Sequence, residues 1–363
     1  MGNVYDVIVV GGGLTGLTAA GLLHETGHSI IILEAAARVG GRILSMREPT
    51  SNRYLGDLGP TWVWPEAQPL AAAWLARLNV ETVPQFDDGE AIIEQAVGVQ
   101  PVRYRLPGVH GSQRIAGGTE AIINRLSEKL SEHSIKTRTR VKTVSISEAI
   151  VEVVTDNAAL PILRARRVVM AVPLRVAAAS IAWSPPLDIR VIRAMEATPT
   201  WMAAQAKAVV VYARPFWRER GLSGRIASRV GPLIETHDHS GLHGTPAAIF
   251  GFIGWPHELR RTHSAELQDK ILQQLVRCFG EDARHPVQFQ VEDWAQNAFV
   301  CASRDLSSTP PHPDQAPAIL RQAHGDGQIF FAIAELSTLS PGLIEGAFDV
   351  GSDVAEKISA TLR

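Results

Sequence analysis

Three glycines near the N-terminus have the spacing of a loop that binds a dinucleotide. Gly11, Gly13 and Gly16 form the pattern G-x-G-x-x-G, and Glu34 follows Gly16 by 18 residues. The first glycine permits a tight turn, the second lets the backbone approach a pyrophosphate, and the third lets a helix pack closely on a strand. A carboxylate at position 34 can accept hydrogen bonds from ribose hydroxyls and would repel a 2′-phosphate. The spacing therefore predicts a dinucleotide without a 2′-phosphate.

The elements around these glycines fit a β-α-β unit. An apolar, β-branched run at 7–10 predicts a strand, 14–23 predicts a helix, and 29–33 predicts a second strand that leads to Glu34. The pyrophosphate would lie at the helix N-terminus, where N–H groups lack partners and the helix dipole favours anions. The alternatives are a simple strand-to-helix turn and a membrane span over 7–23. That span is short and contains five glycines, so the dinucleotide-binding unit explains the segment better.

The composition is typical of a globular protein with two lobes. The chain has 363 residues, 45% of them hydrophobic, and its net charge of −2 gives no electrostatic reason to expect nucleic acid or an anionic membrane as a partner. Cys278 and Cys301 form neither a C-x-x-C pair nor a disulfide framework. The N-terminal MGNVYD lacks the pattern of a signal peptide. We therefore expect a cytoplasmic protein, with assembly into a homo-oligomer left open.

The pattern along the rest of the chain predicts a cofactor domain that is discontinuous in sequence. Its expected elements are an amphipathic helix after the glycine pair at 117–118, strands at 141–146, 150–155, 165–173 and 327–335, and a helix from about 343. In the other domain we expect strands at 206–212 and 247–255, and a helix that Ser264 caps and Gly280 ends. The first and last strand-helix pairs would then face the same cofactor.

The predicted fold class is α/β, with two domains of unequal size. A Rossmann-like cofactor domain is expected over 1–75, 112–190 and 305–363. A smaller α+β substrate domain is expected over 76–111 and 191–304.

Four sequence blocks resemble the flavin-dependent amine oxidases, the family of monoamine oxidases, polyamine oxidases and histone lysine demethylases. The blocks are LEAAARVGGR, DLGPTWVWPEAQP, AKAVVVYARPFWRERGLSG and FFAIAELSTLSPGLIEGA. They extend over nearly the whole chain. The resemblance implies a GR2-type flavoprotein fold in which the dinucleotide is FAD.

The resemblance also implies roles for individual residues. The expected FAD-binding residues are Gly11, Gly13, Leu14, Thr15, Gly16, Glu34, Arg38, Gly41, Arg42, Gly59, Thr61, Trp62, Val141, Trp294, Glu335 and Ile344. Of these, Arg42 could instead be a solvated charge and Trp294 a core aromatic residue. Lys207 would be the catalytic residue, because the family places a lysine there whose ammonium holds a water near flavin N5. Desolvation between apolar neighbours would lower its pKa. The alternative is an edge-strand lysine that points outward and discourages sheet pairing.

Several positions depart from the family pattern. Ser303 stands where a cysteine can bond the flavin, so we expect FAD to be bound noncovalently. Arg304 and Leu343 stand where two tyrosines usually form an aromatic cage. If Arg304 faces the flavin, the substrate should carry an acidic group; the alternative is that Arg304 pairs with an acid outside the pocket. Only 47 residues separate Pro69 from Gly117, which predicts a reduced substrate lobe, left more open or completed by a partner chain.

The segment HDHSGLH contains three histidines that could be interpreted as a metal site. His237, His239 and His243 lie close to Asp238, but no second ligand cluster accompanies them. Glycine and serine are typical of loops, so the expectation is a solvated loop and no metal.

The predicted function is that of an FAD-dependent oxidase or dehydrogenase acting on the carbon–nitrogen bond of an amine or amino acid. Hydride transfer to flavin N5, hydrolysis of the imine, and reoxidation by oxygen or another acceptor would follow. The alternatives are a renalase-like or desaturase-like flavoprotein with a non-amine substrate, and a non-catalytic FAD-binding subunit. Lys207 favours the amine oxidase, since the other enzymes do not need it.

Overall fold

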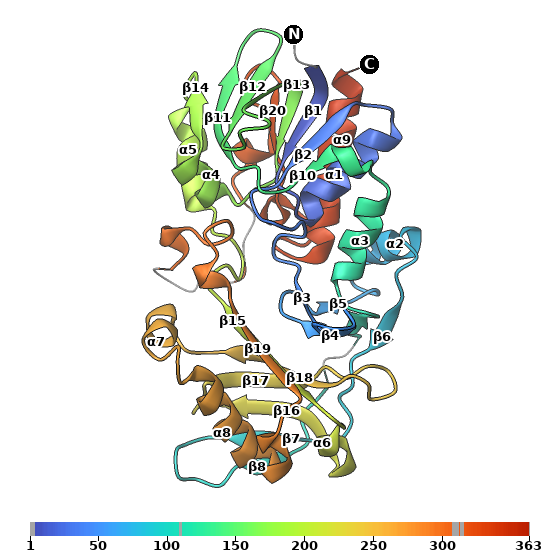
Figure 1. The fold of residues 1–363 in the computed structure, drawn as a ribbon, viewed down its shortest axis with the longest axis vertical. Coiled ribbons are helices and arrows are strands. Elements are labelled where there is room, and N and C mark those ends of the chain that lie inside the picture. The colour runs from blue at the N-terminus through green and yellow to red at the C-terminus, as the bar shows by residue number, and fades with distance from the viewer. Residues whose placement is uncertain (1–3, 109–110, 307–311, 313–315, 363) are drawn as a thin grey trace.

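Two large β-sheets, each covered by helices, form the two lobes of the protein (Figure 1). The computed structural model describes residues 4–108, 111–306, 312 and 316–362. Both termini of the described chain lie in the upper lobe of Figure 1, and the second sheet lies in the lower lobe.

The first sheet has eight strands and contains both the N-terminal and the last strand of the described chain. Its order is β10-β2-β1-β13-β12-β11-β14, and β20 pairs with the second half of β13. The strands are β1 Val4–Val10, β2 Ile30–Leu33, β10 Ile135–Lys136, β11 Val141–Ile146, β12 Val151–Thr155, β13 Ile162–Met170, β14 Ala182–Ser184 and β20 Ile329–Phe331. Four of the pairings are parallel, namely β10 with β2, β2 with β1, β1 with β13, and β13 with β20. Parallel strands with both faces covered are expected to be apolar, as in β2 and in residues 7–10 of β1.

The register of the parallel strands brings four loops to one edge of the sheet. Val10 at the end of β1 pairs with Leu33 of β2 on one side and with Met170 of β13 on the other. Met170 in turn pairs with Phe331 of β20. The loops that follow these strands therefore leave the sheet side by side, at the edge where open α/β sheets bind ligands.

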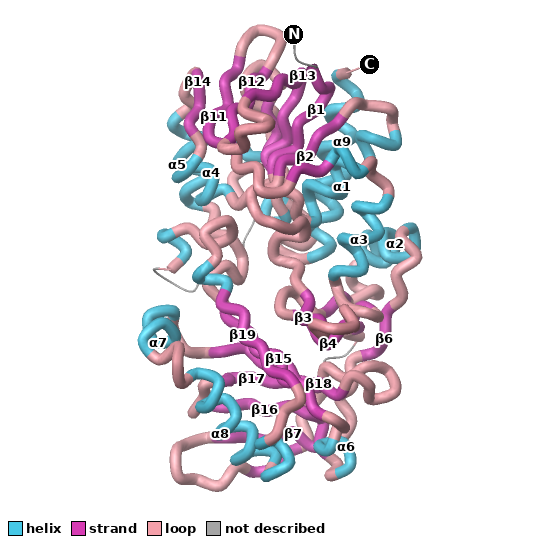
Figure 2. The backbone as a smooth tube through the Cα atoms, viewed as in Figure 1, coloured by secondary structure: helices cyan, strands magenta, loops and turns pink. Residues whose placement is uncertain are grey.

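Helices surround the first sheet (Figure 2). They are α1 Leu14–Glu25, α2 Pro69–Arg77, α3 Glu120–Glu128, α4 Leu174–Ser180, α5 Ile189–Ala197 and α9 Ile344–Thr361. The two helices next to the expected dinucleotide loop, α1 and α9, cross at a glycine. A Cβ on Gly351 would lie 2.8 Å from the carbonyl oxygen of Thr15, so glycine at this position permits the close crossing.

The second sheet has seven strands in the order β19-β15-β18-β17-β16-β7-β8. They are β7 Glu90–Glu94, β8 Val102–Tyr104, β15 Ala206–Tyr212, β16 Leu222–Ser228, β17 Leu233–Asp238, β18 Ala247–Ile253 and β19 Gln288–Asp293. Three helices accompany this sheet: α6 Phe216–Glu219, α7 His257–Thr262 and α8 Leu267–Phe279. The predicted helix α8 ends before Gly280 as expected, but the predicted cap is wrong. The helix begins at Leu267 after Glu266, so Ser264 lies outside it.

Alternate residues of β15 face two different hydrophobic clusters. Ala206, Ala208 and Val210 pack in the cluster that contains α8. Val209 and Val211 face the opposite way and pack with Leu55 and Phe250 in a cluster between the lobes. Lys207 shares this second face, because side chains alternate along a strand.

Two small sheets lie at the junction of the lobes. One pairs β3 Ser45–Arg47 with β4 Tyr54–Asp57, and the other contains β5 Trp62–Val63, β6 Thr82–Pro84 and β9 Gln113–Ile115. Short 3₁₀ helices complete the described elements: η1 Glu132–Ser134, η2 Glu281–Arg284, η3 Trp294–Gln296, η4 Ser303–Asp305, η5 Ala318–Arg321 and η6 Ala334–Leu336.

The domain boundaries stay a prediction, although the sheets fall in the expected segments. Strands of the first sheet come from 4–33, 135–184 and 329–331, and those of the second come from 90–104 and 206–293. Within the described part of the chain, none of the helices has the length and apolar composition needed to span a bilayer.

Candidate active site

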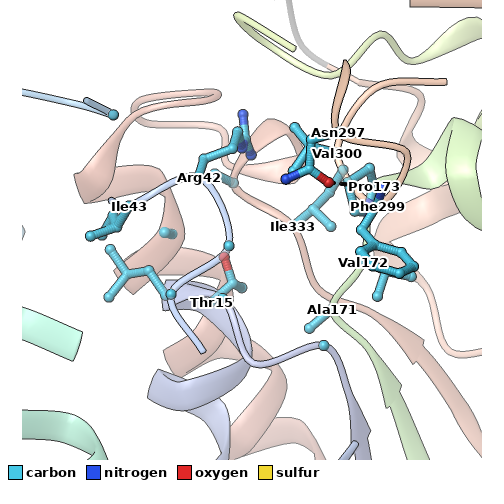
Figure 3. Close-up of a pocket in the computed structure, with 18 of the residues that line it drawn as sticks. Thr15, Arg42, Ile43, Ala171, Val172, Pro173, Asn297, Phe299, Val300 and Ile333 are labelled. Atoms are coloured by element: carbon cyan, nitrogen blue, oxygen red, sulfur yellow. Dashed lines mark hydrogen bonds between the residues drawn. The ribbon is translucent and has the colours of Figure 1, made fainter. Parts of the chain in front are cut away.

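A cavity of about 370 Å³ opens at the edge of the first sheet where the four loops meet. Figure 3 shows part of its wall, with Thr15, Arg42 and Ile333 around the opening and Val172 beside Phe299. Sixteen predicted site residues line it: Gly11, Gly13, Leu14, Thr15, Glu34, Arg38, Gly41, Arg42, Gly59, Thr61, Trp62, Val141, Lys207, Trp294, Leu343 and Ile344. The structure therefore brings together residues that are far apart in sequence.

The glycine-rich loop forms one end of the cavity and has the geometry that its spacing predicts. Gly11 has φ +105°, and a Cβ there would lie 2.4 Å from the carbonyl oxygen of Ala171. A Cβ on Gly16 would lie 2.2 Å from the Gly11 carbonyl oxygen, so Gly16 supports the loop without lining the cavity. Gly13 faces open space and provides no side chain to cap α1. The N-terminus of α1 is thus available to an anion.

Glu34 is held in one orientation by the backbone around it. Its Oε2 accepts a hydrogen bond from the Gly12 amide, and its Oε1 accepts one from the Ala36 amide, both at 2.7 Å. The residue is buried and still lines the cavity. Each oxygen can accept more than one hydrogen bond, so the carboxylate is available to further donors.

Arg42 lines the cavity, whereas Glu335 lies behind it and orients the arginine. The guanidinium donates two hydrogen bonds to the buried carboxylate of Glu335, at 2.7 and 3.1 Å, and one to the Trp201 carbonyl. Glu335 also accepts a hydrogen bond from the Trp201 amide. Arg38 donates to the carbonyls of Val39, Gly41 and Ile43, so it fixes the loop that carries Arg42.

Lys207 reaches the cavity from the second lobe. Its Nζ donates to the Gly59 carbonyl at 2.9 Å and to the hydroxyl of Thr61, and it lies 4.1 Å from the centre of the Phe250 ring. Burial lowers the pKa of Lys207 to about 7, although the charge of Asp57 acts in the opposite direction. An amine with this pKa can exchange a proton near neutral pH.

The alternative of an outward-pointing edge lysine is wrong. Strand β15 lies between β18 and β19, and Lys207 is only 2% exposed. An apolar strand with one lysine is compatible with both positions, because sequence does not show which strands become neighbours.

The cavity wall contains residues that the sequence did not single out. They are the aromatic Trp64, Trp201, Phe252 and Phe299, together with Met202, Gln205, Asn297, Val172 and Pro173. Two signals could have identified some of them. The segment Ala171–Pro173 directly follows a buried strand, at the edge where ligands bind. Asn297 and Phe299 belong to the same short block as Trp294.

Three further predicted residues on the cavity wall come from separate parts of the chain. The Trp294 indole donates to the Leu58 carbonyl at 3.1 Å, which fixes its ring beside the segment that contains Gly59. Val141 begins β11, and Leu343 directly precedes α9.

Arg304 does not reach this cavity, so the predicted contact with the substrate is not formed. Its side chain is 60% exposed and pairs with Glu196 at 3.3 Å. The cause is the 3₁₀ turn η4, in which the Asp305 carboxylate accepts hydrogen bonds from the Ala302 amide and from Arg175. This turn places Arg304 on the surface, as in the alternative in which it pairs with an acid outside the pocket.

The interpretation of HDHSGLH as a solvated loop is wrong for its first four residues. His237 and Asp238 end strand β17, and they, His239 and Ser240 have no exposed surface. Leu242 and His243 are exposed. No group of three or more metal-binding side chains is found among the residues that the structure describes.

Known proteins that are similar in sequence and known structures that are similar in fold are both flavin-dependent or amine-oxidising enzymes by name. The family model of the flavin containing amine oxidoreductases matches residues 14–98 and 96–359. Flavin-containing amine oxidase B of Rattus norvegicus is 25% identical over 99% of this chain and 86% of the relative. Flavin-containing amine oxidase A of Bos taurus is 24% identical over 98% and 85%, respectively.

Two solved structures resemble this fold over almost their whole length. Cyclohexylamine oxidase from Brevibacterium oxydans IH-35A superposes with a TM-score of 0.81 at 19% identity, over 99% of this chain and 100% of the other. Putrescine oxidase bound to putrescine has a TM-score of 0.79 at 20% identity, over 99% of each chain. The predicted α/β fold with a Rossmann-like flavin-binding domain and a second domain is confirmed. The chain belongs to the flavin-containing amine oxidoreductases and is a flavin-dependent enzyme that oxidises amines.

Proposed function

We propose that the flavin is FAD and that the cavity binds it with the adenosine half at Glu34. The observation that carries this proposal is the combination of an uncapped helix N-terminus at Gly13 with an oriented carboxylate at the end of β2. A pyrophosphate fits the first and a ribose fits the second. Flavin mononucleotide would need neither the ribose acceptor nor the lining that Val141 provides. FAD added to apoprotein should therefore bind much more tightly than flavin mononucleotide, and equal affinities would contradict the proposal.

We propose further that FAD is held noncovalently. Ser303 has no thiol, and the nearby Cys301 is buried, with its Sγ 3.6 Å from the Ala302 carbonyl oxygen. Burial raises the pKa of the Cys301 thiol to about 12, so the thiolate needed for bond formation is rare. Acid precipitation should leave yellow FAD in the supernatant, whereas colour in the washed pellet would contradict the proposal.

Lys207 supports the chemistry because its ammonium group can donate a proton in an otherwise apolar part of the cavity. When bound, the flavin accepts hydride from the carbon next to the substrate nitrogen. The ammonium donates hydrogen bonds to Gly59 and Thr61, and its third N–H is left to bind a water. Around it, Phe252 and Trp62 exclude bulk solvent. We propose that Lys207 binds this water and exchanges a proton with it.

The wall favours an amine that carries an apolar group. Glu34 is the one acid among the described residues that line the cavity, and it lies at the glycine-rich end, bonded to two amides. A second ammonium on the substrate would therefore lack a carboxylate partner near Lys207. Arg304 is on the surface, so a substrate carboxylate would lack the predicted partner as well. The aromatic residues beside Lys207 can instead bury an apolar group or contact a cationic nitrogen.

An anaerobic screen tests this assignment. Apolar monoamines should bleach the flavin absorbance, and diamines and amino acids should do so more slowly. Bleaching by amino acids alone would contradict the substrate class. No bleaching by any amine would favour a non-amine substrate or a non-catalytic subunit. Arg304→Met is the control, since it should leave the KM for monoamines unchanged.

Location in the cytoplasm and assembly into a homo-oligomer remain predictions. Both cysteines are free and buried in the structure, which is consistent with a reducing compartment. Size-exclusion chromatography with light scattering would give the oligomeric state.

A further inference from the structure

A buried carboxylate, Asp57, lies at the start of the segment that holds Lys207. It ends strand β4 and has no exposed surface. Gly59 and Thr61, the two partners of the Lys207 ammonium, follow it by two and four residues. The position of Asp57 therefore fixes the start of the segment that contains Gly59 and Thr61.

The carboxylate of Asp57 accepts hydrogen bonds from several neutral donors. Its Oδ1 accepts from the Ser45 hydroxyl at 3.0 Å and from the Thr119 amide and hydroxyl at 2.9 and 3.0 Å. Its Oδ2 accepts from the Tyr54 hydroxyl at 3.0 Å. This arrangement fixes the carboxylate from three separate parts of the chain. A buried carboxylate with only neutral donors still needs an opposite charge nearby.

His239 does not provide that charge. Its Nε2 accepts a hydrogen bond from the Asp57 amide at 2.8 Å, so the ring proton must be on Nδ1. Burial lowers the pKa of His239 to about 4, which keeps the imidazole neutral at physiological pH. The histidine therefore orients the Asp57 backbone without neutralising its carboxylate.

Lys207 is a cation in the same buried region. Its Nζ lies against the Phe250 ring, and the His239 ring that contacts Asp57 packs on the same Phe250, with centroids 5.1 Å apart. We infer that Asp57 is a positioning residue for amine oxidation, which fixes the Gly59–Thr61 segment around Lys207 and supplies the counter-charge of the ammonium. This inference rests on the proposed role of Lys207.

The other groups around Lys207 can be compared with Asp57. Strand β18 contributes the apolar Phe250 and Phe252, and the segment after β17 contributes the neutral His239. Strand β19 contributes Glu292, the cross-strand neighbour of Lys207, whose pKa is raised by burial. Arg114 of β9 donates to the Ser240 carbonyl, and its charge interacts with Tyr54, Asp57 and Asp238. Glu292 is therefore the competing counter-charge.

The first experiment compares the pH dependence of anaerobic flavin reduction in Asp57→Asn and Glu292→Gln. Asparagine keeps the shape and one acceptor oxygen but removes the charge. The apparent pKa of the rate at saturating amine should fall by about one pH unit in Asp57→Asn, because the ammonium loses its counter-charge. Glu292→Gln should leave it unchanged. A shift in Glu292→Gln with none in Asp57→Asn would overturn the inference.

The second experiment needs no flavin and no turnover. Urea unfolding of the apoprotein is measured at pH 6 for wild type, Asp57→Asn, Lys207→Met and the double variant. Asp57→Asn should lower the midpoint more in the presence of Lys207 than in the Lys207→Met background, because only the former leaves an uncompensated ammonium. An equal loss in both backgrounds would make Asp57 purely structural and overturn the inference.

The inference can also be tested if Asp57→Asn does not fold. If Asp57→Asn does not fold, the double variant with Lys207→Met must recover folding, since both charges are then absent; an unfolded double variant contradicts the inference. The two experiments also separate the inference from the proposed function. If Lys207→Met keeps full activity, the catalytic proposal is wrong, while the apoprotein cycle still measures whether Asp57 and Lys207 interact.

Discussion

Arg42 and Glu335 form a two-bond ion pair that joins segments 293 residues apart in the sequence. The carboxylate is fully buried and also accepts the Trp201 amide. The pair therefore connects the loop after the β-α-β unit to the segment that precedes α9, and it fixes the guanidinium that faces the cavity.

Glu335→Gln should lower the free energy of unfolding by about 2–4 kcal/mol, because it leaves the partly buried Arg42 without its counter-charge. Urea denaturation measures this. The control is Glu258→Gln, which removes an exposed pair with Arg261 and should change the stability little. Similar losses in both variants would show that burial of the Arg42 pair has no special effect.

Glu34→Gln should weaken FAD binding by roughly 1–3 kcal/mol. The amide cannot accept all the hydrogen bonds that the carboxylate accepts, and a charge-assisted bond to the ribose is lost. Titration of apoprotein with FAD gives the change in Kd. Unchanged affinity would mean that Glu34 only orders the loop through Gly12 and Ala36.

The stability of the apoprotein should rise with pH between about 7 and 10.5. Burial lowers the pKa of Lys207 to about 7 from its ordinary value of 10.5, so the unfolded chain binds more protons than the folded chain in this range. The destabilisation is fully present below pH 7 and disappears toward pH 10.5. Lys207→Met should therefore lack this rise. Parallel pH profiles for the two proteins would contradict this prediction.

Two glycines on α1 should respond in opposite ways to alanine. In Gly16→Ala the new Cβ would meet the Gly11 carbonyl oxygen at 2.2 Å, so the loop must move and FAD binding should be lost. In Gly21→Ala the Cβ meets nothing within 4 Å, and the helix should gain about 1 kcal/mol. Flavin content and the thermal midpoint check both changes. Retention of FAD by Gly16→Ala would show that the loop tolerates the displacement.

The local part of the site was predictable from the sequence, because backbone rules act over short distances. The tight turn at Gly11, the helix start after Gly13 and the acid at Glu34 depend on residues within one β-α-β unit. Lys207 was predictable only through the resemblance, since its acceptors Gly59 and Thr61 come from the other lobe.

The errors concern residues whose surroundings come from distant segments. Nothing near His239 in sequence shows that the Asp57 amide and the Phe250 ring would bury it. Arg304 was misplaced because a 3₁₀ turn, held by Asp305 and Arg175, directs it away from the cavity. Counting along the chain assumes a regular strand or loop, and one tight turn is enough to change the face on which a side chain lies.

The pairing of the first strand with late segments has a consequence for folding during synthesis. Strand β1 pairs with β13, which pairs with β20, and α1 packs on α9. These contacts join residues that are far apart in the sequence. The late segments also bring Ile333, Leu343 and Ile344 into the cavity wall. A nascent chain lacks these walls until β20 and α9 have left the ribosome, although the β-α-β unit is already synthesised. Flavin capture must therefore wait for these late segments, and until then the apolar face of α1 that α9 covers is open to chaperones.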